Sequence, residues 1–344
     1  MTKKNLSRLF RVALIGGGIV AATFIILHSA FYGKAIDGEI VVRVTSSTTY
    51  GEIIEQLRPS LRSALHRQAF DFYAKRLNLE KRYKAGYYIF NGNESVIRAV
   101  RRLVLGEQTP VRLVIGEART LPQLAGKISA QIEADSVALL SAMRNKQIRK
   151  ELGFVKDSTI AMFIPNTYEV WWSISPEKLL HRIAREYKSF WNEERRAKLK
   201  RCRLTQYQVM TLASIVYEEV KIPSEMRMIA GVYINRLRRG IALQACPTVK
   251  YAMGDFALQR ILHKHLKYRS PFNTYINRGL PPAPICVPSI AAIDAVLDYA
   301  EHQYLYFCAR PELDGRHNFA RTLKEHNANA QKYAKAIERL KINR

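Results

Sequence analysis

The chain has 344 residues and a strongly basic composition, in which 55 Lys and Arg against 29 Asp and Glu give a formal net charge of +26. This length allows two domains with sizeable cores, since a domain usually takes ~100 to 200 residues. The basic residues occur as scattered pairs, such as Arg101-Arg102, and form no single stripe, so we expect no nucleic-acid partner. The four cysteines show no Cys-x-x-Cys spacing, which leaves a zinc knuckle without support.

The N-terminal segment indicates where the chain resides. Residues 12–32 carry no charge and match the ~20 residues that a helix needs to cross a bilayer. The flank 1–11 contains four basic residues, which favour a cytoplasmic N-terminus. We expect an uncleaved single-pass anchor in the inner (cytoplasmic) membrane, with the rest of the chain outside the cytoplasm. A removed signal peptide is the alternative, because Ser29 and Ala30 are small residues near the end of the apolar run.

Residues 40–135 repeat one phrase three times, an apolar strand followed by a polar turn and an amphipathic helix. The predicted strands are 40–44, 87–90 and 111–115. Such alternation predicts one or more small α+β modules. Helix-rich sequence follows to about residue 202, interrupted near the Trp171-Trp172 pair. These tryptophans are interpreted as core residues, with the wall of a carbohydrate groove as the alternative.

The segment 205–221 predicts a helix that carries a candidate acid. Thr205 and Gln208 have the spacing of a capping box, which fixes the helix start. Glu219 lies on the apolar face of this helix, three, four and seven residues after Val216, Ile215 and Leu212. Loss of solvation there would raise the pKa of the Glu219 carboxyl toward neutral pH. The alternative is a helix-terminal Glu that turns to solvent.

Glu218 falls on a different face of the same predicted helix, with Ser214 and Thr211, and we expect that face to be polar. A second helix, Met226 to Arg239, is expected after a Ser224 cap. Loops rich in Pro, Asn, Thr and Tyr then run to about residue 285, and such loops are plausible walls of a polar cleft. A β-hairpin of 304–308 and 317–319 and a last helix are expected to end the chain.

Seven ordered pieces of the chain resemble the endolytic murein transglycosylase family, the MltG or YceG-like proteins. They are Ala213-Ser-Ile-Val-Tyr-Glu-Glu219, Val232-Tyr-Ile-Asn-Arg-Leu237, Leu243-Gln with Pro247-Thr-Val, Phe272-Asn-Thr-Tyr275, Gly279-Leu-Pro-Pro282, Tyr304-Leu-Tyr-Phe307, and His317-Asn-Phe319 with His326-Asn327. Tyr83-Lys-Ala-Gly86 is similar to the family's small LysM-like module, which implies contact of the first module with glycan.

The resemblance implies cleavage of the bond between N-acetylmuramic acid (MurNAc) and N-acetylglucosamine (GlcNAc) without water. One Glu protonates the leaving oxygen and then takes the proton of the muramyl O6 hydroxyl, which closes a 1,6-anhydro ring. Position matching assigns this role to Glu219. No second carboxylate is required, since pairs of carboxylates serve glycosidases that activate water or form a glycosyl-enzyme. Glu225 and Asp255 are expected to be cap or surface residues, with electrostatic help as the alternative.

The same resemblance places seven residues around the sugar: Gln244, Thr248, Asn273, Thr274, Tyr275, His317 and His326. Turn capping and loop bracing are the alternative roles of the five polar loop residues, and satisfied structural histidines are the alternative for the other two. No cofactor or metal is expected. His263 and His265 would be spaced to chelate a metal only on a strand.

Two positions depart from the family pattern. Tyr217 stands where the family usually has an acidic residue, and Cys246 stands where it usually has Asp before Pro247. Cys286 is a further position where that pattern calls for no cysteine, and both cysteines belong to loops that the resemblance places around one cleft. We therefore considered a Cys246–Cys286 disulfide against the default of free thiols.

The sequence as a whole predicts an α+β protein with a transmembrane helix, a small LysM-like α+β module and a mixed α+β catalytic domain. The expected segments are a cytoplasmic flank 1–11, an anchor 12–32, the module or modules 40–135, and a YceG-like catalytic domain 136–344. The expected function is an endolytic peptidoglycan lytic transglycosylase that acts on glycan strands near the membrane. A non-catalytic peptidoglycan-binding scaffold is the alternative, and peptidoglycan synthases are candidate partners.

Overall fold

The computed structural model describes residues 3–154, 158–258 and 260–342, and it is a mixed α+β protein with an N-terminal apolar helix. Its internal contacts divide the chain into two compact units. The first unit is Met1–Arg112 with Gln131–Glu133 and Glu169–Ile174, and the second is Leu113–Ala130, Ala134–Tyr168 and Ser175–Arg344. The division therefore falls near residue 112, whereas we expected a boundary near 135. The assignment of separate functions to these stretches stays a prediction.

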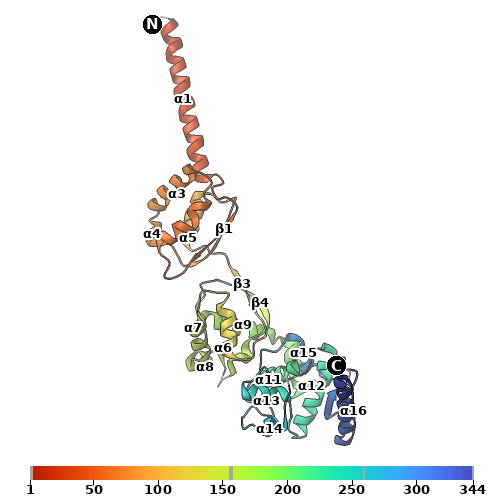
Figure 1. Ribbon diagram of the computed structural model, residues 1–344. Coiled ribbons are helices and arrows are strands. Elements are labelled where there is room, and N and C mark those ends of the chain that lie inside the picture. The colour runs from red at the N-terminus through yellow and green to blue at the C-terminus, as the bar shows by residue number, and fades with distance from the viewer. Residues whose placement is uncertain (1–2, 155–157, 259, 343–344) are drawn as a thin grey trace. The chain divides into compact units, whose positions relative to one another are not determined.

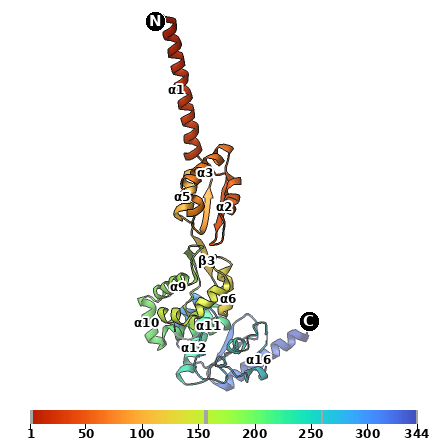
Figure 2. The same cartoon turned by 90° about the vertical axis from the view of Figure 1, so that its left-hand side faces the viewer.

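The first unit pairs two strands in antiparallel fashion and covers them with helices (Figures 1 and 2). β1 (Glu39–Val44) pairs with β2 (Gly86–Asn91) in the register Glu39 to Asn91 and Val44 to Gly86. The helices of this unit are α1 (Lys3–Tyr32), α2 (Tyr50–Leu57), α3 (Ala64–Arg76), α4 (Leu79–Arg82) and α5 (Val96–Leu105). The first two predicted phrases of strand, turn and helix are thus confirmed.

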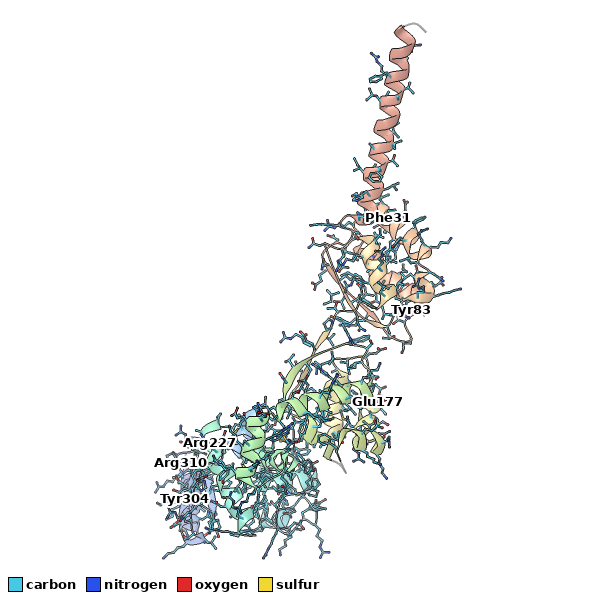
Figure 3. The ribbon with its side chains drawn as sticks, turned by 180° about the vertical axis from the view of Figure 1, so that it is seen from behind. Phe31, Tyr83, Glu177, Arg227, Tyr304 and Arg310 are labelled. Atoms are coloured by element: carbon cyan, nitrogen blue, oxygen red, sulfur yellow. The ribbon has the colours of Figure 1, made fainter. Side chains whose placement is uncertain are left out.

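Local sequence signals set the helix ends of this unit. Thr49 and Glu52 form a capping box at the start of α2, and the Ser95 hydroxyl caps α5. α5 ends at Gly106, whose φ of +75° is a conformation that glycine adopts without strain. Tyr83, labelled in Figure 3, donates its hydroxyl to the Thr48 carbonyl at 2.7 Å and so ties the segment before β2 to the start of α2.

The end of α1 is part of the core of the first unit. Phe10–Tyr32 is one helix long and apolar enough to cross a membrane, and its most apolar window is not buried in the protein. Its last turn behaves differently, because Ala30 is only 1% exposed and the Phe31 ring lies 5.9 Å from the ring of Phe72 in α3. Figure 3 shows Phe31 where α1 meets the rest of this unit.

The second unit contains the third predicted phrase and most of the helices. β3 (Val111–Ile115) pairs with β4 (Asn166–Val170), and the division between the units falls within both strands. The helices that follow are α6 (Leu121–Ser129), α7 (Ser136–Arg144), α8 (Lys146–Leu152), α9 (Pro176–Phe190) and α10 (Glu193–Cys202). Trp171 is 50% exposed, so its interpretation as a core residue is wrong, and Trp191 is the tryptophan buried at the end of α9.

The centre of the second unit is α11 (Gln206–Glu219), whose start carries the predicted capping box of Thr205 and Gln208. All residues of α11 from Val209 to Val216 are buried. Full burial stabilises the fold by about 1.5 to 3 kcal/mol for each large aliphatic side chain, so this helix is a rigid support for its last turn.

The next helix, α12 (Pro223–Arg238), starts earlier than expected. Ser224 is not its cap, because Ile222 occupies the cap position without a side-chain hydrogen bond and Pro223 takes the first helical position. Proline suits that position because the first N–H groups of a helix have no partner within it. Further along α12, a Cβ on Gly231 would overlap the backbone oxygen of Ala300, so glycine allows the helix to approach that segment closely.

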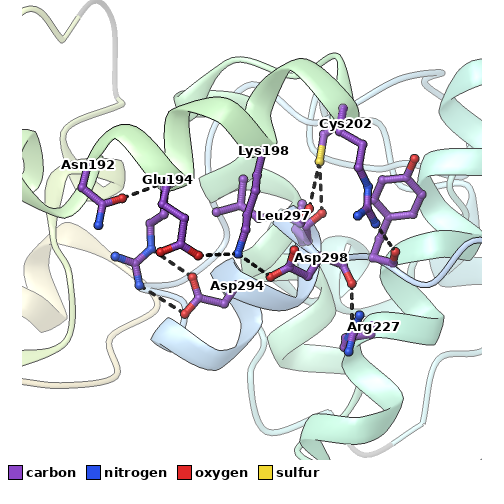
Figure 4. A network of polar contacts seen from close by, with 12 residues as sticks. Asn192, Glu194, Lys198, Cys202, Arg227, Asp294, Leu297 and Asp298 are labelled. Carbon is purple, nitrogen blue, oxygen red and sulfur yellow. Dashed lines mark hydrogen bonds and ion pairs between the residues drawn. The ribbon is translucent and has the colours of Figure 1, made fainter.

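Polar side chains connect α10 to α15 (Ile290–Leu297), a helix that packs against α11 and α12. Figure 4 shows Lys198 between Glu194 and Asp298, with Nζ to oxygen distances of 2.8 and 2.9 Å. The Arg227 guanidinium of α12 donates from Nε to the backbone oxygen of Asp298 at 2.7 Å. These bonds link α10 and α12 to Asp298 at the end of α15.

A β-hairpin and a long helix complete the unit, as predicted. β5 (Tyr306–Ala309) pairs antiparallel with β6 (His317–Ala320), and α16 (Leu323–Ile342) packs against both strands. Two shorter helices, α13 (Cys246–Met253) and α14 (His263–Leu266), lie within the loop-rich segment.

Candidate active site

The last turn of α11 delivers Glu219 to a pocket of about 410 Å³ in the second unit. The residue as a whole is partly buried, and its carboxyl group is enclosed. Its Oε1 accepts a hydrogen bond from the hydroxyl of Tyr233, on α12, at 2.9 Å. The expected position of Glu219 on an enclosed helix face is therefore confirmed, and the alternative of a Glu turned to solvent is wrong.

The pKa of Glu219 is raised from 4.5 to about 7, and burial is the largest cause of this rise. The hydrogen bond from Tyr233 and the charge of Lys250 oppose the rise, and the charge of Glu218 adds to it. Burial disfavours the charged form of a carboxyl group, whereas donors and cations favour it. With a pKa near 7 the group can both give and take a proton at neutral pH.

We expected the face of α11 that carries Glu218 to be polar and solvated. In the structure this face is buried. Ser214 and Thr211, which share that face, are both buried, and the Ser214 hydroxyl accepts the Ile285 N–H at 2.9 Å. Glu218 itself forms an ion pair with Arg119 at 3.0 Å. The two adjacent glutamates thus have different environments, one with a cationic partner and one with a neutral donor.

Four of the predicted binding residues line the same pocket as Glu219. They are Gln244, Tyr275, His317 and His326. The backbone of Gln244 has a φ of +53°, a strained conformation for this residue, and its N–H donates to the Thr274 carbonyl at 3.0 Å. Its side-chain oxygen accepts a hydrogen bond from Arg236 at 3.2 Å. Gln244 is therefore fixed at the pocket by the loop of Thr274 and by Arg236 of α12.

The other three predicted binding residues, Thr248, Asn273 and Thr274, do not line this pocket. Each is at most 1% exposed. The hydroxyls of Thr248 and Thr274 lie 2.9 Å apart, and the amide of Asn273 donates to the carbonyls of Leu266 and Tyr268. These contacts match the alternative role of loop bracing, since all three side chains use their hydrogen bonds within the protein.

The proposed disulfide between Cys246 and Cys286 is wrong, because all four cysteines are free. Cys286 is buried against α11 with its Sγ directed to the Ser214 carbonyl at 3.6 Å. Cys246 instead lines the pocket, where its Sγ lies 3.2 Å from the Tyr275 hydroxyl. Burial raises the pKa of both Cys246 and Tyr275, so these two groups are neutral at neutral pH.

We expected Glu225 to be a cap or surface residue. That expectation is wrong, because Glu225 is only 7% exposed. It accepts two hydrogen bonds from His317, one from the backbone N–H at 3.0 Å and one with ring Nδ1 at 2.7 Å. The pairing joins the first turn of α12 to the start of β6. Asp255 is exposed, in agreement with a surface role.

His326 lines the pocket from the first turn of α16. Its ring stacks on Tyr306 with 5.4 Å between the ring centroids. Burial, together with the charge of Arg236, lowers the pKa of His326 below its ordinary value of 6.5, so the ring is neutral at neutral pH. A neutral imidazole can both donate and accept a hydrogen bond.

Sequence reasoning missed two residues that shape the pocket. Tyr233 is fully enclosed beside Glu219, and Arg236 is buried with its guanidinium bonded to three backbone carbonyls, those of Ala242, Leu243 and Leu305. Both belong to the quoted piece Val232–Leu237, where a tyrosine and an arginine one turn apart on a largely apolar helix were the available signal.

The candidate metal pair His263 and His265 lies on the short helix α14 and not on a strand, so the condition for chelation is not met. Among the residues with described placement, one group of three could hold an ion, formed by the exposed Glu151, Glu177 and His181. None of these lines the pocket around Glu219.

The geometry defines a class of site. One enclosed carboxyl group with a pKa near 7 lines a pocket whose walls carry amide, hydroxyl and imidazole groups, an arrangement that can exchange a proton with a polar molecule. The family model of the YceG-like family matches residues 42–332, and the chain therefore belongs to the YceG-like family.

Curated relatives and a solved structure agree with this membership. An "Endolytic murein transglycosylase" of Bacillus subtilis (strain 168) is 27% identical over 289 residues, which cover 77% of each chain. The protein of the same name from Streptococcus pneumoniae (strain D39) is 27% identical over 336 residues, which cover 87% of this chain and 60% of that one. A crystal structure of a YceG-like protein from Listeria monocytogenes matches with a TM-score of 0.57 and 27% identity, covering 84% of this chain and 98% of that one.

Proposed function

We propose that the chain is an endolytic peptidoglycan lytic transglycosylase that cleaves the MurNAc–GlcNAc bond of glycan strands. The observation that carries this proposal is the enclosed carboxyl of Glu219, whose pKa of about 7 suits both steps of proton transfer. The names of the curated relatives support the choice of substrate and reaction.

In the first step, Glu219 gives its proton to the glycosidic oxygen, and the bond from that oxygen to C1 of MurNAc breaks. In the second step, the O6 hydroxyl oxygen of the same MurNAc bonds to C1, and its proton passes to Glu219. The carboxyl group ends the cycle protonated and no water is consumed. One residue suffices because the proton given and the proton taken pass through the same group.

The walls of the pocket supply the contacts that hold the sugar. Gln244, Tyr275, His317 and His326 offer donors and acceptors for hydroxyl and acetamido groups. Three other residues do not contact the sugar but hold the segments that carry Gln244 and Tyr275 in place. They are Thr248, Asn273 and Thr274.

Mass analysis of products from purified glycan strands tests the proposal. Internal cleavage with 1,6-anhydromuramyl ends is the expected result. Strands that stay intact while binding to the protein would instead support a non-catalytic peptidoglycan-binding scaffold, and reducing muramyl ends would show hydrolysis.

We also propose that α1 is retained as a single-pass anchor in the cytoplasmic membrane, with the second unit outside the cytoplasm. The length and composition of Phe10–Tyr32 support a span. The small residues that favoured a cleavage site lie in a helical turn, and Ala30 is packed into the core of the first unit. N-terminal sequencing of the protein from membranes should find the chain intact. A mature N-terminus at or beyond residue 30 would contradict the anchor.

The first unit is proposed to be the LysM-like module and to contact glycan. A hollow of about 490 Å³ opens beside the start of α2 and is lined by polar side chains, among them Thr45, Ser47, Thr48 and Gln56. Such groups suit sugar hydroxyls. Ser47→Trp, which fills this hollow, should weaken binding of glycan strands to the full chain. Peptidoglycan synthases stay predicted partners.

A further inference from the structure

Glu225 is a buried carboxylate that the proton transfers of Glu219 do not use. It lies in the first turn of α12, and its two oxygens each face His317 of β6. Oε1 accepts the backbone N–H of His317 at 3.0 Å, and Oε2 lies 2.7 Å from the ring nitrogen Nδ1. The exposed fractions of the two side chains are only 9% and 13%.

This pairing decides which ring nitrogen of His317 holds the proton. A carboxylate can only accept hydrogen bonds, so Nδ1 must carry a hydrogen and donate it to Glu225. In the neutral ring, the other nitrogen, Nε2, then has a free lone pair and is an acceptor. Nε2 has no hydrogen-bond partner within the described ranges, although His317 lines the pocket around Glu219.

One aromatic ring, that of Phe307, lies between His317 and Tyr233, the residue that donates a hydrogen bond to Glu219. The ring of Phe307, on β5, contacts Tyr233 edge-on at 5.7 Å and His317 edge-on at 5.3 Å. Tyr233 in turn donates to Glu219. Glu219 and His317 are thus connected through Tyr233 and Phe307, and both line the same pocket.

We propose that Glu225 is a positioning residue, which keeps His317 in the tautomer whose Nε2 accepts a hydrogen bond from the sugar beside Glu219. The donor on the sugar is an acetamido N–H or a hydroxyl. This inference rests on the proposed function and deepens it, because it assigns a substrate contact to one ring atom and a purpose to a second buried carboxylate.

Glu225→Gln tests the proposal with little change of shape. The amide oxygen can still accept the backbone N–H of His317, but the amide NH₂ would donate to Nδ1 and move the ring proton to Nε2. Two donors would then face each other at the sugar. We expect KM for glycan strands to rise about tenfold or more, as for one lost hydrogen bond with an unpaired donor, while kcat changes much less.

A matched control is Glu177→Gln, which removes a first-turn carboxylate from α9 and faces no histidine of the pocket. KM should stay unchanged in this control. Binding of uncross-linked glycan to Glu219→Gln protein, with and without Glu225→Gln, separates recognition from catalysis, and the second substitution should weaken binding by the same factor as KM.

The ¹⁵N spectrum of the histidine rings in the full chain reads the tautomer directly, with His317 assigned by comparison with His317→Gln. The expected result is a proton on Nδ1 in the wild type and on Nε2 in Glu225→Gln. A wild-type proton on Nε2, or an unchanged KM and glycan affinity in a folded Glu225→Gln protein, would overturn the inference. If the wild-type protein binds glycan without cutting it, only the proposed lytic activity is refuted. The tautomer and the glycan affinity then still test the role of Glu225.

Discussion

Replacement of Glu219 by Gln should abolish cleavage and, at alkaline pH, make the second unit more stable. The amide keeps the shape of the side chain and an oxygen that accepts the Tyr233 hydrogen bond. It loses the transferable proton, which should lower kcat by at least the ~10²-fold typical of a general acid or base. It also loses the buried charge that the wild type must carry at high pH.

The size of the stability effect follows from the pKa of Glu219, about 7 in the folded chain against 4.5 for a free glutamate. Between these pH values the folded chain keeps a proton that the unfolded chain has lost, so wild-type stability falls as the pH rises. Above pH 7 the full cost is about 3 kcal/mol, at about 1.4 kcal/mol per pKa unit. Below pH 4.5 both states are protonated and the cost disappears.

The assay is therefore thermal unfolding of wild type and Glu219→Gln at pH 5 and pH 8, together with product analysis. We expect the variant to unfold several degrees above the wild type at pH 8 and close to it at pH 5. Glu218→Gln is the matched control, because it breaks the ion pair with Arg119 and should keep most of the activity without a gain at pH 8. Anhydromuramyl products from Glu219→Gln, or an equal shift at both pH values, would refute the reasoning.

Three further predictions concern the same unit. Tyr233→Phe removes a hydrogen bond that lowers the pKa of Glu219, so the alkaline limb of the pH–rate profile should move up, and a downward move would contradict the geometry. Cys246→Asp should move that limb up as well by placing a charge near the acid, whereas Cys246→Ser should leave it in place. Gly231→Ala should cost about 1 to 3 kcal/mol of unfolding free energy through its overlap with the backbone, while Gly126→Ala, in open space on a helix, should be neutral or slightly stabilising in chemical denaturation.

Local sequence was enough to predict the elements that carry the candidate acid. The capping box at Thr205 fixed the start of α11, and helical periodicity then placed Glu219 among apolar neighbours. The hairpin of β5 and β6 could also be predicted from the sequence of its strands and turn. These features depend on residues close together in the chain, where propensity and spacing carry most of the information.

Contacts between distant segments could not be read in the same way. Ser214 is polar, yet it is buried on α11, where the N–H of Ile285, 71 residues away, donates to its hydroxyl. Glu225 and His317 are separated by 92 residues, so nothing in the local sequence of either predicts their pairing. Thr248 and Thr274 are a similar case, since their hydroxyls bond each other between α13 and the loop of Thr274.

The partners of three glutamates explain how a single carboxyl group can serve as the acid. Glu218 is held by the cationic guanidinium of Arg119 at 3.0 Å, and Glu225 is held by His317 at 2.7 Å. Glu219 faces the neutral hydroxyl of Tyr233 and is enclosed, and this burial disfavours its charged form. Burial thus raises the pKa of Glu219 to about 7, so this carboxyl group can carry a proton at neutral pH, whereas Glu218 and Glu225 are each bonded to a basic side chain, Arg119 and His317.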